Sequence, residues 1–165
     1  MNITTKDNVH LGAWFIVSDS FYTSFNLTPV TQGSSSSTTS PAARASALRI
    51  YPTVLFFHGN AGSRAVSFRV ATYTAYTTRL GANVLALDYR GYADSEGTPS
   101  EEGLRHDARA AWQWVIDQGA DPNDIILVGQ SLGTAVATNL AKELAAEGEC
   151  FQYISGCQSD TMSLF

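Results

Sequence analysis

The chain has 165 residues, of which 44% are hydrophobic, so it can bury one modest core and we expect a single domain over residues 1–165. Its net charge of −5, with only 15% charged residues, provides no basic surface of the kind that binds nucleic acid. No apolar run is long enough to span a bilayer, and the N-terminus lacks a basic-then-apolar signal pattern. We therefore expect a soluble protein with no nucleic-acid partner and no transmembrane segment in this chain.

The first third of the sequence predicts one strand and one flexible segment. Apolar and polar residues alternate from 9 to 17, which is the period of a strand. Residues 18–46 are rich in Ser, Thr, Pro and Ala and contain a run of four serines at 34–37. Such a composition buries too little apolar surface to order itself, so we expect a flexible surface insertion.

From residue 53 onward, short apolar runs alternate with helix-length segments, which predicts βαβ units and a parallel sheet. The predicted strands are 53–57, 83–88 and 125–128, and the predicted helices cover about 63–80, 98–118 and 134–146. Right-handed crossovers would place the second and third strands beside the first, both parallel to it. Thr98-Pro99-Ser100-Glu101 predicts the start of the second helix, as a capping box with Pro at the first helical position.

The stretch Gly129-Gln130-Ser131-Leu132-Gly133 lies where the last predicted strand turns into a helix. A strand, a sharp turn and a helix are the setting of a nucleophile elbow, which exposes a serine hydroxyl beside donors for an oxyanion. Gly129 and Gly133 would be needed because strand and helix backbones approach too closely there for a Cβ. The alternative is an ordinary strand-to-helix turn.

Two further motifs precede this stretch, His58-Gly59-Asn60-Ala61-Gly62 and Asp88-Tyr89-Arg90-Gly91-Tyr92. In this order the three motifs resemble the α/β-hydrolase superfamily, and most closely its monoacylglycerol and lysophosphatidylserine lipase branch. The resemblance covers roughly residues 4–17 and 51–148. It implies an α/β fold with a mainly parallel sheet flanked by helices, incomplete at the C-terminal side, and a divergent tail over 148–165.

The resemblance also implies roles for single residues. Ser131 would be the nucleophile, and the backbone N–H groups of Asn60 and Leu132 would form the oxyanion hole. The residues expected to shape the surrounding loops are His58, Gly59, Asp88, Arg90, Gly129 and Gly133. The substrate would be an acyl ester or a lipid, without metal or cofactor. The resembled lipases are associated with the endoplasmic reticulum membrane, so peripheral membrane association stays open, as does the compartment.

The sequence departs from this family after Ser131, where we also expect the lid over the acyl pocket to be absent. The triad of the fold runs nucleophile, acid, histidine, yet residues 132–165 contain no histidine, and their one aspartate, Asp160, lies in a polar tail. We therefore expect this chain to hydrolyse esters poorly, and the sheet edge beside the elbow to lack its covering strands. The alternatives are a non-catalytic hydrolase-like fragment or binding protein and, third, a peptidase of the same fold.

Other residues that could carry chemistry have simpler interpretations. His58 lies at the same sheet edge as the elbow, but the fold supplies its base after the last strand. We expect His10 on a sheet face, His106 on a helix surface and Ser95 in a loop. Trp112 and Trp114 should be packing residues. Cys150 should be a small buried thiol, and Cys157 a second free thiol.

Overall fold

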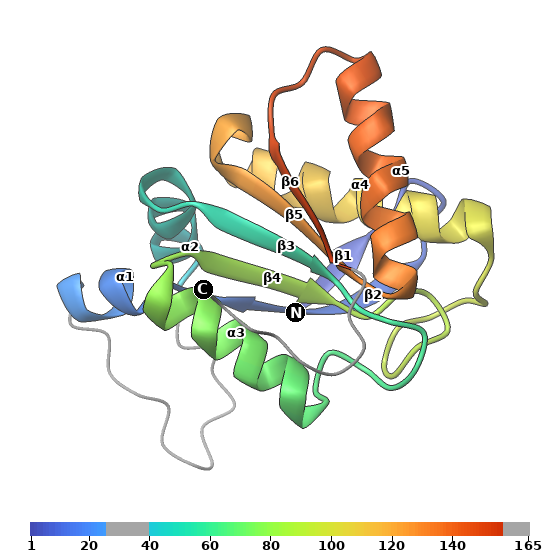
Figure 1. Ribbon diagram of the computed structural model, residues 1–165, viewed down its shortest axis with the longest axis horizontal. Helices are drawn as coiled ribbons and strands as arrows, with labels where there is room; N and C mark the ends of the chain where they lie inside the picture. Colours follow the sequence, from blue (N-terminus) through green and yellow to red (C-terminus); the bar gives the residue numbers. More distant parts are fainter. Residues whose placement is uncertain (26–39, 157–165) are drawn as a thin grey trace.

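The computed structural model describes residues 1–25 and 40–156. These residues form a six-stranded sheet in the order β1-β2-β4-β3-β5-β6, and helices cover both of its faces (Figure 1). The strands are β1 Asn2–Thr4, β2 His10–Ile16, β3 Thr53–Phe57, β4 Asn83–Leu87, β5 Ile125–Gln130 and β6 Gln152–Gly156. Strands β3 to β6 run parallel, whereas β2 is antiparallel to both of its neighbours.

The centre of the sheet agrees with the sequence. Strand β3 lies between β4 and β5 and is parallel to both, with Val54 opposite Val84 and Leu55 opposite Leu127. Every residue of β3 and β4 is buried, which is why the sequence shows continuous apolar runs there rather than alternation. The predicted arrangement of these three strands is confirmed.

Two layers of helices complete the fold. The helices are α1 Asp19–Ser24, α2 Pro41–Ile50, α3 Ser67–Arg79, α4 Glu101–Asp117 and α5 Leu132–Ala146, with a 3₁₀ turn at Pro122–Asp124. Helices α1 and α3 lie on one face of the sheet, and α4 and α5 pack together on the other (Figure 1). Among the described residues, no helix combines the length and the apolar character needed to cross a bilayer.

Two predicted helix starts need correction. Helix α4 begins at Glu101, because Ser100 rather than Thr98 is the N-cap and accepts a hydrogen bond of 3.0 Å from the N–H of Gly103. Helix α3 begins at Ser67, four residues later than predicted. The N–H of Arg64 is used instead to bind Asp88, at 2.6 Å, which keeps 63–66 in the preceding loop.

The range 18–46, expected to be a flexible insertion, contains helix α1 and the start of α2. Its serines act as helix caps: Ser18 accepts from the N–H of Phe21 and Ser40 from the N–H of Ala43. Phe21 is fully buried and packs edge-on against Tyr51. The expectation was therefore wrong for both ends of the range, and residues 26–39 lie outside the described part.

The tail also differs from the expectation. Strand β6 pairs with β5 in parallel register, with Ile154 opposite Val128, so the edge of β5 beside the elbow is covered. The hydroxyl groups of Tyr153 and Thr138 lie 2.5 Å apart and tie β6 to α5. Aromatic and β-branched residues favour a strand here, although the surrounding composition is polar. Residues 157–165 are outside the described part.

Candidate functional site

Ser131 occupies a sharp turn between β5 and α5. Its backbone has φ 51° and ψ −116°, a conformation that residues other than glycine rarely adopt, and its side chain is exposed. The carbonyl oxygen of Ser131 accepts a hydrogen bond of 2.9 Å from the N–H of Thr134, which starts the helix directly after the turn. The hydroxyl group is thus held at the C-terminal edge of the sheet.

The two flanking glycines lie where backbones cross at close range. A Cβ on Gly129 would lie 2.6 Å from the Cα of Thr134. A Cβ on Gly133 would collide with the carbonyl oxygen of Phe57 and would lie 2.9 Å from that of His58. Only glycine allows α5 to begin directly against the end of β3. The predicted close approach of strand and helix is present.

The loop after β3 lies against this turn. A Cβ on Gly59 would be 3.4 Å from the Cβ of Ser131. The N–H of Gly59 donates a hydrogen bond of 3.3 Å to Oε1 of Gln130, the residue before the serine. The sequence motifs at 58–62 and 129–133 are therefore neighbours in space, as parallel strands that end at one edge require.

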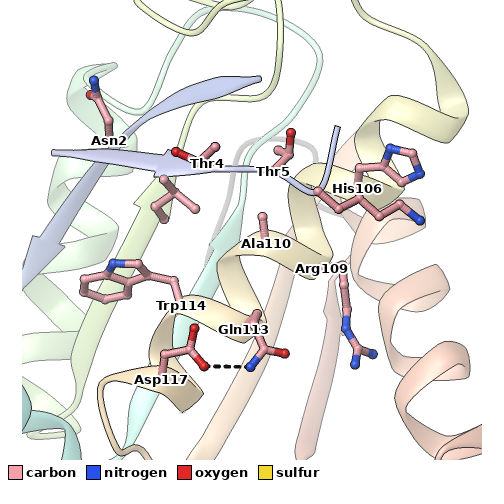
Figure 2. Close-up of a pocket in the computed structure, with 11 residues that line it drawn as sticks. Asn2, Thr4, Thr5, His106, Arg109, Ala110, Gln113, Trp114 and Asp117 are labelled. Atoms are coloured by element: carbon pink, nitrogen blue, oxygen red, sulfur yellow. Dashed lines mark hydrogen bonds between the residues drawn. The ribbon is translucent and has the colours of Figure 1, made fainter. Parts of the chain in front are cut away.

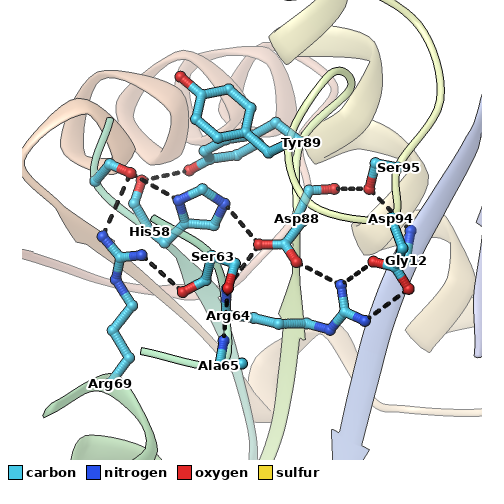
Figure 3. A network of polar contacts seen from close by, with 12 residues as sticks. Gly12, His58, Ser63, Arg64, Ala65, Arg69, Asp88, Tyr89, Asp94 and Ser95 are labelled. Atoms are coloured by element: carbon cyan, nitrogen blue, oxygen red, sulfur yellow. Dashed lines mark hydrogen bonds and ion pairs between the residues drawn. The ribbon is translucent and has the colours of Figure 1, made fainter. Parts of the chain in front are cut away.

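His58 is fully buried beneath this loop (Figure 3). Its Nδ1 lies 2.7 Å from the carbonyl oxygen of Gly59, which can only accept, so Nδ1 carries a proton. Its Nε2 lies 3.2 Å from Oδ1 of Asp88, and its own carbonyl oxygen accepts from the hydroxyl group of Tyr89. Both ring nitrogens are directed to groups other than Ser131. His58 thus lies among the residues that hold the loops together.

Asp88, which follows β4, is the centre of a buried polar network (Figure 3). Its carboxylate binds the guanidinium group of Arg64, which also forms a two-pronged ion pair with Asp94 at 2.6 and 2.9 Å. Its carbonyl oxygen accepts from the hydroxyl group of Ser95, and Ser95 in turn accepts from the N–H of Gly12. The network joins the loops after β3 and β4 to strand β2.

Arg90 links three further segments. It donates from its N–H and its Nε to the two carboxylate oxygens of Asp107, both at 2.8 Å, and from its two Nη groups to Asp7 at 2.7 and 3.0 Å. These hydrogen bonds from Arg90 are the main reason why the pKa of Asp7 is lowered. His106, expected on the helix surface, is instead mostly buried, with Nδ1 3.4 Å from Asp7.

Sequence reasoning missed three buried charged residues of this region, Arg64, Arg69 and Asp107. A signal existed for Arg69, which lies at helical spacing between two apolar residues, Val66 directly before α3 and Tyr73 within it. Its guanidinium group donates to carbonyl oxygens of the loop after β3, as Figure 3 shows. For Arg64 and Asp107 the sequence carried no comparable signal.

The simpler interpretations hold for most of the remaining residues. Ser95 is a buried loop serine, and Trp112 and Trp114 pack in and against the core. His10 is exposed and its Nδ1 lies 3.1 Å from the hydroxyl group of Thr4. Cys150 is a free thiol but is exposed, which corrects the expectation of a buried one. Cys157 lies outside the described residues.

A cavity of about 430 Å³ opens beside the turn. Asn60 and Leu132, whose N–H groups were assigned to an oxyanion hole, both line it. The other lining residues are partly apolar and come mainly from the start of α4 and the first turns of α5; they include Pro99, Leu104, Ala135, Val136 and Asn139. The turn that carries the hydroxyl group therefore adjoins a space with an apolar wall, and Glu101 and Arg105 add charged groups to its lining.

A second cavity, of about 570 Å³, lies between β1 and α4 (Figure 2). Trp114 and Ala110 form its apolar side, and polar groups such as Arg109 surround them. None of the three sequence motifs contributes to it. Within the described ranges, no three His, Cys, Asp or Glu side chains converge as metal ligands.

Known proteins resemble this chain in sequence and in fold. A family model described as the alpha/beta hydrolase fold matches residues 52–147. Lysophosphatidylserine lipase ABHD12 of Danio rerio is 46% identical over 98 residues, which are 59% of this chain and 25% of that protein. The chain thus spans about a quarter of the length of this relative.

Solved structures show the same architecture. An esterase of Pyrococcus furiosus has a TM-score of 0.60 at 24% identity, over 91% of this chain and 45% of that one. An alpha-beta hydrolase of Vibrio vulnificus has a TM-score of 0.56 at 37% identity, over 60% of this chain and 35% of that one. The first of these likenesses is evidence for the fold alone.

Proposed function

Because this chain belongs to the alpha/beta hydrolase fold family, we propose that it is a serine hydrolase of carboxylic esters, with lipid esters as its substrates and Ser131 as its nucleophile. The observation that supports this most directly is the left-handed backbone of Ser131 at the turn between β5 and α5. Such strain is retained where a structure needs one side chain in a fixed place. An ordinary strand-to-helix turn has no such requirement.

The reaction would be acyl transfer to the hydroxyl group. Attack of the Ser131 oxygen on the ester carbonyl places a negative charge on the carbonyl oxygen, while the hydroxyl proton passes to solvent water, because no imidazole of the described residues is directed to Ser131. The N–H of Leu132 follows the nucleophile, and the N–H of Asn60 belongs to the adjoining loop. Both residues line the cavity beside the turn, so their N–H groups are the candidate donors to the oxyanion.

The cavity also supports an ester with an apolar acyl chain. Leu104, Ala135 and Val136 offer a hydrophobic wall next to the candidate oxyanion donors. The name of the Danio rerio relative, a lysophosphatidylserine lipase, agrees with a lipid substrate. Peripheral association with a membrane surface would follow from such a substrate and is part of the proposal.

A second candidate function, a non-catalytic binding protein, is favoured by the three histidines. His58 faces Asp88, His106 faces Asp7, and the ring of His10 lies beside Thr4. None of these imidazoles is engaged with Ser131.

For the hydrolase, we propose that none of the three histidines is the general base, so that the 165-residue chain hydrolyses esters slowly. Its remaining activity would come from transition-state stabilisation, which in disabled triads still gives roughly 10³–10⁴ over water.

Labelling with a fluorophosphonate probe separates the two candidates. We expect the probe to modify wild-type protein at Ser131 slowly, because no base assists the hydroxyl group, and to leave Ser131→Ala unmodified. Ser67→Ala, which removes an exposed serine of α3, should be modified at the wild-type rate. Absence of Ser131 labelling in wild type even after prolonged exposure to a high probe concentration would favour the binding protein.

Turnover of p-nitrophenyl esters tests the base and the substrate class. We expect Ser131-dependent turnover well below the roughly 10 s⁻¹ of ordinary enzymes, and no turnover of the matching p-nitroanilide. If the ester is turned over at about 10 s⁻¹ and this turnover is lost in His58→Gln or His106→Gln, the exclusion of these histidines as general base is contradicted. Cleavage of the anilide would favour a peptidase.

A further inference from the structure

Arg69 is a buried cation that reaches from α3 to the loop after β3 (Figure 3). Its side chain donates to the carbonyl oxygens of Ala61 at 2.7 Å, Ser63 at 2.8 Å and Gly59 at 3.4 Å. Its Nε donates to Oε1 of Gln130 at 3.0 Å, the same oxygen that accepts from the N–H of Gly59. One guanidinium group thus binds both the loop and the residue before Ser131.

These contacts are unusual among the buried arginines of the structure. Arg64 and Arg90 each bind carboxylates, whereas the hydrogen bonds of Arg69 go to uncharged oxygens. Arg69 is only 3% exposed, and its removal from water lowers its pKa. Within the described part of the chain Arg69 has no carboxylate partner, and such a buried charge is costly to keep, so hydrophobic packing alone would favour another residue at this position.

The peptide unit between Gly59 and Asn60 connects Arg69 to the candidate oxyanion donor. The carbonyl group of Gly59 and the N–H group of Asn60 belong to one planar trans peptide, in which they point in opposite directions. The carbonyl oxygen is held by Nδ1 of His58 at 2.7 Å and, at 3.4 Å, by Arg69, which also binds the next carbonyl groups of the loop. Fixing that oxygen fixes the direction of the Asn60 N–H, which is the candidate oxyanion donor.

We propose that Arg69 is a positioning residue of the oxyanion loop, which holds the peptide between Gly59 and Asn60 so that its N–H faces the reacting carbonyl oxygen at Ser131. The inference rests on the proposed function of Ser131. Arg69 does not touch the substrate; it acts through the carbonyl groups of the loop and through Gln130.

The first test compares Arg69→Met with Arg79→Met, which makes the same change at an exposed site on the same helix. Misplacing a catalytic group or losing an oxyanion donor lowers rates by about 10²-fold or more, so we expect Arg69→Met to slow fluorophosphonate labelling of Ser131 and kcat by about 10–100-fold with little change in KM. Arg79→Met should react at the wild-type rate. Arg69→Lys, which keeps the charge without the fork geometry, should recover part of the loss.

The second test does not depend on activity. In ¹H–¹⁵N spectra, Arg69→Met should shift the amide signals of Gly59 and Asn60, and Arg79→Met should not. Thermal unfolding of each variant reports how much is folded; if Arg69→Met does not fold, Arg69→Lys provides both measurements. Unchanged loop amides, or a rate that falls only with the folded fraction, would overturn the proposal. If Arg69→Met shifts these amide signals but the wild-type protein shows no labelling of Ser131, the positioning role is supported and the hydrolase is refuted.

Discussion

The carbonyl oxygen of Phe57 occupies the space that a side chain on Gly133 would need. Helix α5 therefore begins in direct contact with the end of β3, and this contact fixes the position of Ser131 between them. Because backbone atoms on both sides cannot move aside, Gly133→Ala should lower the free energy of unfolding by about 3 kcal/mol, at the upper end of overpacking costs. Urea denaturation checks this, with the exposed substitution Lys142→Ala on the same helix as control. A loss below about 0.5 kcal/mol, typical of surface sites, would contradict the tight contact.

The cavity beside the turn should set the preferred acyl length. Ala135→Phe would fill part of it, because Ala135 is one of its lining residues. Butyrate has two more methylene groups than acetate, each worth ~0.8 kcal/mol when buried, so the preference for p-nitrophenyl butyrate over acetate should fall by about tenfold. Competitive rates of Ser131 acylation measure this. Ala145→Phe, at an exposed position of α5 outside the cavity, should keep the wild-type preference, and an equal effect of both substitutions would refute the assignment.

The ion pair between Asp7 and Arg90 should appear in the pH dependence of stability. Hydrogen bonds from Arg90, and then from Thr5, lower the pKa of Asp7 in the folded protein. An acid of this kind stabilises the fold above its unfolded pKa, about 3.9, and loses that contribution as the pH falls further. Asp7→Asn should therefore be less stable than wild type at neutral pH, and this difference should shrink below about pH 3.9.

Urea unfolding of both proteins across this pH range measures the difference. Asp117→Asn, which removes an exposed carboxylate bonded to Gln113, controls for the change in net charge. A difference that stays constant from neutral to acid pH would show that Asp7 contributes to stability by means other than its charge.

Helix α1 should stabilise the fold through a single aromatic side chain. Phe21 is fully buried, whereas Phe25, which stacks on it with ring centroids 4.2 Å apart, is 51% exposed. Phe21→Ala should cost about 3–5 kcal/mol because it leaves a cavity in the packed interior. Phe25→Ala, the matched control, should cost about 1 kcal/mol, since half of the ring already faces water. Thermal unfolding of the two variants decides whether this segment is packed or flexible.

The sequence was sufficient for the parts of this fold that follow from local periodicity. Continuous apolar runs identified β3, β4 and β5, and the glycines at 129 and 133 identified the turn that carries Ser131. Helix boundaries were less accurate, because the choice between Thr98 and Ser100 as N-cap depends on where the preceding loop delivers the chain.

The buried ion pairs could not be predicted, because they join residues far apart in the sequence. Arg90 reaches Asp7 and Asp107, and Arg64 reaches Asp88 and Asp94, across loops whose course only the folded structure shows. Composition was also a poor guide at 18–25 and 40–46. A single buried phenylalanine and two serine caps outweigh a polar average, since order depends on individual contacts.

The left-handed backbone of Ser131 also has a thermodynamic consequence. A residue with a Cβ pays roughly 1–3 kcal/mol to hold such a conformation, whereas glycine adopts it without steric conflict. Ser131→Gly should therefore unfold at a higher temperature than the wild-type protein while losing the hydroxyl group that the proposed chemistry requires. Natural proteins trade stability for activity at such positions. The gain in stability on removing the hydroxyl group would measure what the fold gives up to hold a side chain at this turn.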